Sequence, residues 1–238
     1  MRRAQPWLGT LVEIAIAEAP HAEPGAAFDA AFARIAAVHE TMSPQRPASD
    51  IARFNAAAAG TRLDCDAGTL AVLEAARQLS DASAEAFDIT QGQGGLSGWQ
   101  LRSPHLFKLD TASGLDLGGI AKGYAVDQAI TALRDAGVTA GWVNAGGDLG
   151  VFGALELPIH IRSPDDPART LPLVGLRDGA LATSVLPRRH GGRAHITVAA
   201  PECLWADALT KVVAYATPQH STALLARYHA RAWQHATF

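Results

Sequence analysis

A glycine pair, a lysine and the start of a predicted helix follow one another in residues 115–127, which read LDLGGIAKGYAVD. We predict a short apolar strand that ends at Gly118 and Gly119, then a helix to about Ala136, because apolar residues recur at helical spacing. The first N–H groups of a helix are unpaired, and glycine lets another molecule approach the backbone. Lys122 lies in the first turn, where a cation is unfavourable unless an anion is near. The pattern indicates a phosphate or pyrophosphate site, and a tight turn with a solvated lysine explains it equally well.

A second group of polar side chains lies at the start of a helix predicted over residues 206–214. Asp207 is in its first turn, where a carboxylate is favourable for the helix dipole. Thr210 and Lys211 follow three and four residues later, so they share a helical face with the carboxylate. If the two groups act together, the chain must bring Asp207 alongside the glycine pair.

The elements that must position these groups are predicted from apolar periodicity. Further helices are expected over 26–42 and 68–83, and Gly137 ends the central helix. Ser49 and Asp50 are expected to cap a short turn over 51–55. Strands are expected over 8–17, 141–152, 159–162, 171–176, 180–184 and 195–200, and a last helix and strand close the core. Since strands and helices do not alternate regularly, we predict an α+β fold with mainly antiparallel sheets and packed helices. Residues 1–238 are expected to form a single domain, or two interlocked α+β subdomains.

Composition narrows the class of protein and of partner. Hydrophobic residues make up 48% and charged residues 18%, which fits a globular protein rather than a disordered one. The net charge of −3 comes with no basic run, so a nucleic-acid partner is not expected. Cys65 and Cys203 lack metal-type spacing and indicate isolated thiols. The first residues show no apolar segment with a small-residue cleavage site, so we expect a cytoplasmic protein without a membrane anchor.

The order of several short motifs resembles the FAD:protein FMN transferase family, also called the ApbE family, of which this would be a short and divergent member. Residues 116–127 carry the most specific match. The weaker matches, in the family's order, are GT (9–10), SDI (49–51), FN (54–55), AFDIT (86–90), NAGGDL (144–149), ATS (182–184) and ADAL (206–209). The resemblance extends from Leu8 to about Ala216, and it depends on the shared order of the motifs.

This resemblance implies a reaction and a set of contacts. The family cleaves FAD at its pyrophosphate, passes FMN to a threonine hydroxyl of a target flavoprotein, and releases AMP. FAD and an acceptor flavoprotein are therefore the expected partners. The residues matched to the flavin nucleotide are Leu8, Asn55, Ala86, Phe87, Asp88 and Asp116, with Gly118 and Lys122 at the phosphates.

The resemblance also implies Mg²⁺, held by an aspartate, a threonine four residues later and a backbone carbonyl of the glycine pair. Asp207 and Gly119 match two of these ligands. The threonine is displaced, because the fourth position holds Lys211 and the hydroxyl stands at Thr210. Either Thr210 or its carbonyl ligates the metal, or the Lys211 ammonium takes the metal's place as a single positive charge.

Three further polar features stay open at this level. In the family a His-Ile-Ile-Asp-Pro segment supplies a histidine that helps to activate the acceptor hydroxyl. Here His195 is its remnant and the candidate base, or it belongs to the next strand. The basic stretch 188–193 could face phosphate. Asp148, after a glycine bend, is a positioning group or a buried structural carboxylate.

The altered metal and histidine motifs leave two alternatives to transfer. The chain could be a pyrophosphatase that splits FAD into FMN and AMP, with water as the acceptor. It could also be a non-catalytic flavin-binding or scaffold protein, because a shared fold does not guarantee a shared activity.

Overall fold

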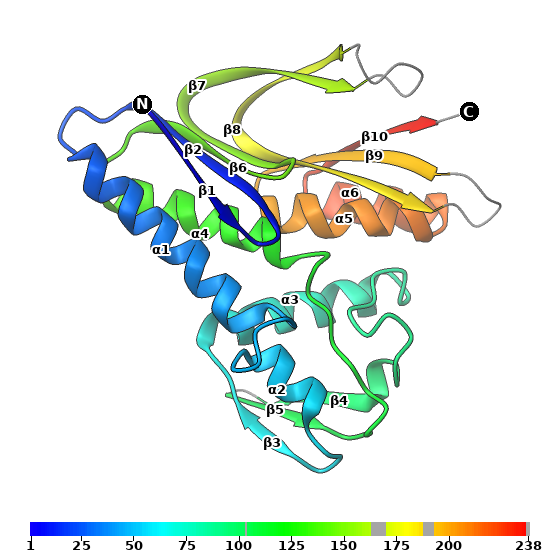
Figure 1. The fold of residues 1–238 in the computed structure, drawn as a ribbon. Coiled ribbons are helices and arrows are strands. Elements are labelled where there is room, and N and C mark those ends of the chain that lie inside the picture. The colour runs from blue at the N-terminus through cyan, green and yellow to red at the C-terminus, as the bar shows by residue number, and fades with distance from the viewer. Residues whose placement is uncertain (103, 163–169, 188–192, 237–238) are drawn as a thin grey trace.

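The computed structural model describes residues 1–102, 104–162, 170–187 and 193–236, which form an α+β fold with two antiparallel sheets (Figure 1). The helices are α1 (Pro24–Met42), α2 (Asp50–Ala56), α3 (Ala67–Ala82), the 3-10 helix η1 (Leu96–Gly98), α4 (Ala121–Asp135), α5 (Cys203–Tyr215) and α6 (Pro218–Arg227). The strands are β1 (Arg2–Trp7), β2 (Thr10–Glu18), β3 (Arg62–Asp64), β4 (Trp99–Arg102), β5 (His105–Lys108), β6 (Ala140–Ala145), β7 (Asp148–Arg162), β8 (Thr170–Pro187), β9 (Arg193–Ala200) and β10 (Arg231–Ala236). The predicted fold class is confirmed.

The larger sheet has seven strands in the order β1-β2-β6-β7-β8-β9-β10, and every neighbouring pair is antiparallel. Helices α1, α4 and α5 lie along one of its faces (Figure 1). In β2, Val12, Ile14 and Ile16 are buried, because alternate side chains of a strand point to the same face. On that face, the central helix α4 packs against both α1 and α5.

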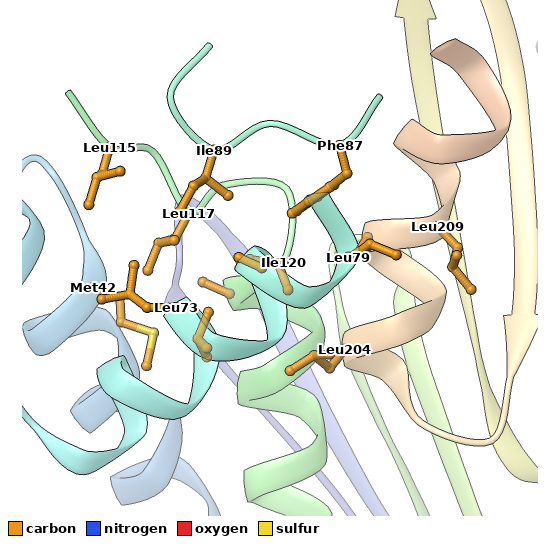
Figure 2. Packing of buried hydrophobic residues seen from close by; sticks show 14 of the residues in the cluster. Met42, Leu73, Leu79, Phe87, Ile89, Leu115, Leu117, Ile120, Leu204 and Leu209 are labelled. Carbon is orange, nitrogen blue, oxygen red and sulfur yellow. The ribbon is translucent and has the colours of Figure 1, made fainter. Parts of the chain in front are cut away.

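The smaller sheet has the order β3-β5-β4 and lies with α2 and α3 below the larger sheet in Figure 1. Figure 2 shows side chains of α3, α5 and the chain before α4 packed in one apolar cluster. Leu117 and Ile120, which flank the glycine pair, are both buried in that cluster. The core therefore fixes the backbone on either side of the two glycines.

Local signals located the helix ends well. The Ser49 hydroxyl accepts a hydrogen bond from the Ala52 N–H at 3.0 Å and caps α2, as predicted. Helix α4 ends at Asp135, and Gly137 has a φ of +85°, a conformation that glycine adopts without strain. Within the described residues, the model has no helix with both the length and the hydropathy that crossing a bilayer requires.

Several strand predictions are corrected. Residues 115–117 form no strand, because the backbone of Leu115 bonds to the side chain of Asn55 rather than to a neighbouring strand. The predicted strand 141–152 is a hairpin of β6 and β7 that turns at Gly146 and Gly147. The segments predicted over 159–162, 171–176 and 180–184 belong to two long strands, β7 and β8. Strand β1 was not predicted.

Candidate functional site

The glycine turn before α4 uses some of its backbone donors internally. Oδ1 of Asp116 accepts a hydrogen bond from the Gly118 N–H at 2.7 Å. The N–H groups of the two residues that follow the glycine pair bond to the Leu117 carbonyl at 3.0 and 2.8 Å. Within the described part of the chain, the Gly119 N–H has no hydrogen-bond partner. Of the glycine pair, Gly119 therefore keeps its backbone N–H as a donor for the predicted phosphate site.

Lys122, which sequence reasoning placed at the phosphates, is held by two carboxylates. Its ammonium contacts Oδ2 of Asp148 and lies 3.6 Å from Oδ2 of Asp207. The two carboxylate side chains are 3% and 0% exposed. Burial lowers the pKa of Lys122, but the charges of Asp207 and Asp148 outweigh it and raise the pKa above its ordinary range. The charge of Lys122 is thus compensated inside the protein.

Asp148 begins β7, directly after the glycine turn of the β6–β7 hairpin. Burial and the neighbouring Asp207 raise its pKa to about 6, against the opposing attraction of Lys122. Of the two roles left open from the sequence, the structure favours a buried carboxylate that positions Lys122.

Two residues of α4 set the position of α5. A Cβ at Gly123 would overlap the carbonyl oxygen of Cys203, so only glycine lets the two helices approach this closely. One turn later, the Asp127 carboxylate accepts hydrogen bonds from the N–H groups of Cys203 and Leu204, each at 2.8 Å. Burial raises the pKa of Asp127 to about 6, although these two hydrogen bonds act in the opposite direction. Gly123 also donates its N–H to Asp207 Oδ2 at 3.4 Å.

Asp207 and the glycine pair are brought together, and Lys211 stands between them. The Lys211 ammonium contacts Oδ1 of Asp207 and donates to the Asp207 backbone carbonyl at 3.0 Å. A Cβ at Gly119 would lie 3.1 Å from Cε and 3.7 Å from Nζ of Lys211. The lysine that sequence reasoning weighed as a substitute for the metal is therefore the cation nearest to Gly119 in this cluster.

Thr210 is directed into the protein rather than toward the glycine pair. Its hydroxyl donates to the Asp207 backbone carbonyl at 2.6 Å and lies 2.8 Å from the Ser184 hydroxyl of β8. The residue has no solvent-accessible surface. Both hydroxyl interactions fasten α5 to itself and to the sheet.

Two cavities open on either side of the glycine turn and share Asp116 and Gly118 in their walls. The first, of about 470 Å³, has mainly apolar walls, which include Leu8, Val38, Met42, Pro44, Leu117 and Ala121, and Lys122 at its edge. The second, of about 480 Å³, is lined by residues that include Ala86, Phe87, Asp88, Gln91, Gly119, Lys211 and Tyr215. The structure thus gathers Leu8, Ala86, Phe87, Asp88, Asp116, Gly118 and Gly119 around one site.

In the second cavity, the part of the wall made by Phe87 and Asp88 is stiffened by the turn that follows these residues in the chain. Phe87 is buried in the core, and the Asp88 carboxylate accepts hydrogen bonds from the Thr90 and Gly92 N–H groups at 2.7 and 3.2 Å. The Asp116 side chain, which lines the same cavity, is also held in place, because its Oδ2 accepts a hydrogen bond from Gln91 Nε2 at 2.6 Å.

The structure does not bring Asn55 or His195 into this site. Both polar atoms of the Asn55 amide bond to the Leu115 backbone, at 3.0 and 2.8 Å, so the side chain ties α2 to the segment before the glycines. His195 pairs with Val185 in the β8–β9 register, while its neighbour Ile196 is buried in the core beside α5. Since successive side chains of a strand alternate, His195 faces away from α5 and lines a separate cavity of about 730 Å³.

The basic stretch 188–193 cannot be placed against the phosphates, since residues 188–192 lie outside the described residues. Asp127 was missed as a positioning residue, although it lies in the central motif. Its partners Cys203 and Leu204 are more than seventy positions away, and no local spacing reveals them.

The fold and the site together define an α+β protein with a charged, glycine-lined site between two cavities. The chain belongs to the ApbE family, which it matches over residues 8–95 and 93–191. Among curated proteins, none matches this sequence.

Solved structures show the same fold. The flavin transferase ApbE from Vibrio cholerae is 20% identical, with a TM-score of 0.87 over 98% of this chain and 92% of that one. The apo form of the Pseudomonas stutzeri flavinyl transferase ApbE is 23% identical, with a TM-score of 0.85 over 100% of this chain and 91% of that one. The apbe protein from Thermotoga maritima is 20% identical, with a TM-score of 0.79 over 98% and 93%. At these identities the likeness establishes the fold.

The donor set around Asp207 does not fit the Mg²⁺ that the family resemblance implies. Mg²⁺ needs about six oxygen ligands in octahedral order. Here Lys211 contacts one Asp207 oxygen, Lys122 and Gly123 approach the other, and Thr210 is turned inward.

Proposed function

We propose that this chain is a flavin transferase that takes FAD as donor and passes FMN to a threonine hydroxyl of a target flavoprotein, releasing AMP. One observation carries the proposal: Lys211 and Gly119 meet on the wall of a cavity that also contains Ala86, Phe87, Asp88 and Asp116, next to the apolar cavity that contains Leu8. Membership of the ApbE family and the fold of flavin transferases support it.

In this proposal, FAD lies across the glycine turn. The isoalloxazine ring occupies the apolar cavity beside Leu8 and Met42, because a flat, largely apolar ring gains from leaving water there. The adenosine half occupies the cavity beside Ala86 and Asp88. The diphosphate then crosses the backbone near Gly119, where no β-carbon obstructs it.

The chemistry asked of the site is phosphoryl transfer. The acceptor hydroxyl oxygen attacks the phosphorus of the FMN half, the P–O bond to the AMP half breaks, and the hydroxyl proton passes to solvent. Negative charge grows on the leaving AMP oxygen, so donors aimed at it lower the barrier. The Lys211 ammonium and the Gly119 N–H are the donors that this chain places there. We route no step through Mg²⁺, since the donor set does not fit it.

The test is an assay with FAD, the purified protein and a flavoprotein acceptor of the kind that the family modifies. Transfer predicts flavin fluorescence that stays with the acceptor band after denaturing electrophoresis, together with one AMP per attached flavin. An acceptor whose target threonine is replaced by alanine is the matched control. Free FMN and AMP without labelled acceptor would identify a pyrophosphatase instead.

A second candidate, flavin binding without transfer, is favoured by one observation. His195, the expected base for the acceptor hydroxyl, faces the opposite side of the sheet from Asp207 and Lys211. In the same assay, this candidate predicts bound and unchanged FAD, with neither AMP nor labelled acceptor.

A further inference from the structure

We propose that the Lys211 ammonium is the cation of this site, so that the diphosphate of FAD binds here without a divalent metal ion. The inference rests on the proposed function in that it takes FAD as the ligand. Three features of the site support it: the donors around the Asp207 oxygens, the inward-facing hydroxyl of Thr210 and the balance of charges in the cluster.

Lys211 is held in place rather than free to swing away. Its ammonium uses one N–H for the Asp207 carboxylate and a second for the Asp207 carbonyl, at 3.0 Å. An ammonium has three donors. Among the described residues no third partner is recorded for it, and the side chain is 19% exposed, on the wall of the cavity beside Gly119. One donor therefore remains for an anion at the glycine turn.

Both carboxylate oxygens of Asp207 already face donors or positive groups of the protein. Oδ1 contacts Lys211, while Oδ2 lies 3.6 Å from the Lys122 ammonium and accepts the Gly123 N–H at 3.4 Å. The Asp207 backbone carbonyl, a further candidate ligand, accepts from both Lys211 and Thr210. A metal at this position would have to displace an ammonium from a carboxylate that is fully buried.

The charges of the cluster already cancel. Asp148 and Asp207 carry two negative charges, and Lys122 and Lys211 carry two positive charges, in one chain of contacts. Adding Mg²⁺ would leave two uncompensated positive charges at a buried site, which is strongly unfavourable. A diphosphate would add negative charge of similar size, but at the solvent-exposed side of Lys211 rather than inside the buried cluster.

The decisive measurement uses Mg²⁺ alone, without flavin, by calorimetry and thermal unfolding of the full chain. The wild type is expected to show neither binding heat nor a shift in melting temperature. The Lys211→Thr variant restores a threonine four residues after Asp207 and is expected to gain both. Lys211→Met removes the ammonium without supplying an oxygen and is the matched control, expected to gain neither. Mg²⁺ binding by the wild type that Asp207→Asn abolishes would overturn the proposal.

A second measurement titrates FAD in EDTA and follows quenching of flavin fluorescence. The wild type is expected to bind equally well in EDTA and in millimolar Mg²⁺, and Lys211→Met to bind about tenfold more weakly or worse, because a charge-assisted hydrogen bond is lost. Wild-type binding that requires Mg²⁺ would overturn the proposal. If FAD binds under neither condition, the proposed function fails, and the titration with Mg²⁺ alone still decides the role of Lys211.

Discussion

Lys211 lies one helical turn after Asp207, and its ammonium contacts both the side chain and the backbone carbonyl of that same residue. The carboxylate is also approached by Lys122, which contacts Asp148, so one fully buried aspartate faces lysines from two different helices. The stability of the fold and the chemistry of the site are therefore coupled at this residue.

Replacing Asp207 by alanine should be strongly destabilising. The change leaves the Lys211 ammonium without its carboxylate partner and Lys122 with Asp148 alone, and removing one member of a buried ion pair costs about 3–5 kcal/mol. Urea unfolding measures the loss. Asp64→Ala is the control, because that side chain is 76% exposed and its pair with His105 should contribute less than about 1 kcal/mol. Equal effects of the two substitutions would contradict the buried cluster.

Alanine substitutions at two glycines of the central motif should differ in their effects on stability and on FAD affinity. At Gly123 the new methyl group meets the backbone of Cys203, which cannot move without separating α4 from α5, so we expect a loss of about 3 kcal/mol or more. At Gly119 it meets the flexible end of Lys211, so stability should change by less than about 1 kcal/mol while FAD affinity falls. Unfolding curves and FAD titrations of both variants check this, and the reverse pattern would refute it.

Replacing Leu8 by asparagine should raise the stability of the protein and weaken FAD binding. It occupies the two-residue turn between β1 and β2 with a φ of +55°, followed by Gly9 at +73°, and a leucine is strained in this conformation. Leu8→Asn should raise the unfolding free energy by up to about 1 kcal/mol, because asparagine tolerates a positive φ. The same change should weaken FAD binding, since Leu8 lines the apolar cavity. A variant that is less stable and binds FAD normally would show that Leu8 acts only in packing.

The Asp127 carboxyl group should make the free energy of unfolding fall as pH rises. Burial raises its pKa in the folded protein from 3.8 to about 6, so between these values the folded state binds a proton that the unfolded state does not. Its contribution to stability therefore falls as pH rises from about 4 to about 6. Asp127→Asn cannot titrate and removes this slope. The measurement is the difference in unfolding free energy between wild type and variant across that range, and a difference that grows with pH in the wild type's favour would contradict it.

Asp127 also caps α5, and a second variant measures how much this cap contributes to stability. Asp127→Ala leaves the N–H groups of Cys203 and Leu204 unpaired, and losing a helix cap costs about 0.5–2 kcal/mol. Thr217→Ala removes the cap of α6, where Thr217 accepts from the His220 N–H at 3.3 Å, and serves as a comparison. If Asp127→Ala left stability unchanged, the hydrogen bonds to α5 would have no energetic role.

The sequence alone predicted those structural features that depend on residues close together in the chain. The cap at Ser49, the stop at Gly137 and the helix over 26–42 were predicted because each requires only local residue types. The strand over 115–117 was wrong because an amide sixty residues earlier, Asn55, takes the hydrogen bonds that a strand would have given to a neighbour.

For the candidate site, the sequence identified the residues involved more successfully than the long-range contacts that these residues make. Asp207 and Gly119 both lie next to Lys211, which was recognised as the departure from the family's metal ligands. Lys122 was assigned to phosphate because its long-range pairing with Asp148 cannot be seen in the sequence. His195 was placed at the site because the strand register that turns it to the other face is also a tertiary property.

A structure of the protein with FAD, crystallised in EDTA, tests the central claim most directly. We predict the diphosphate across the glycine turn, with an oxygen within about 3 Å of Lys211 Nζ and the isoalloxazine ring against Leu8 and Met42. FAD bound elsewhere, or a diphosphate held away from both Gly119 and Lys211, would contradict the account.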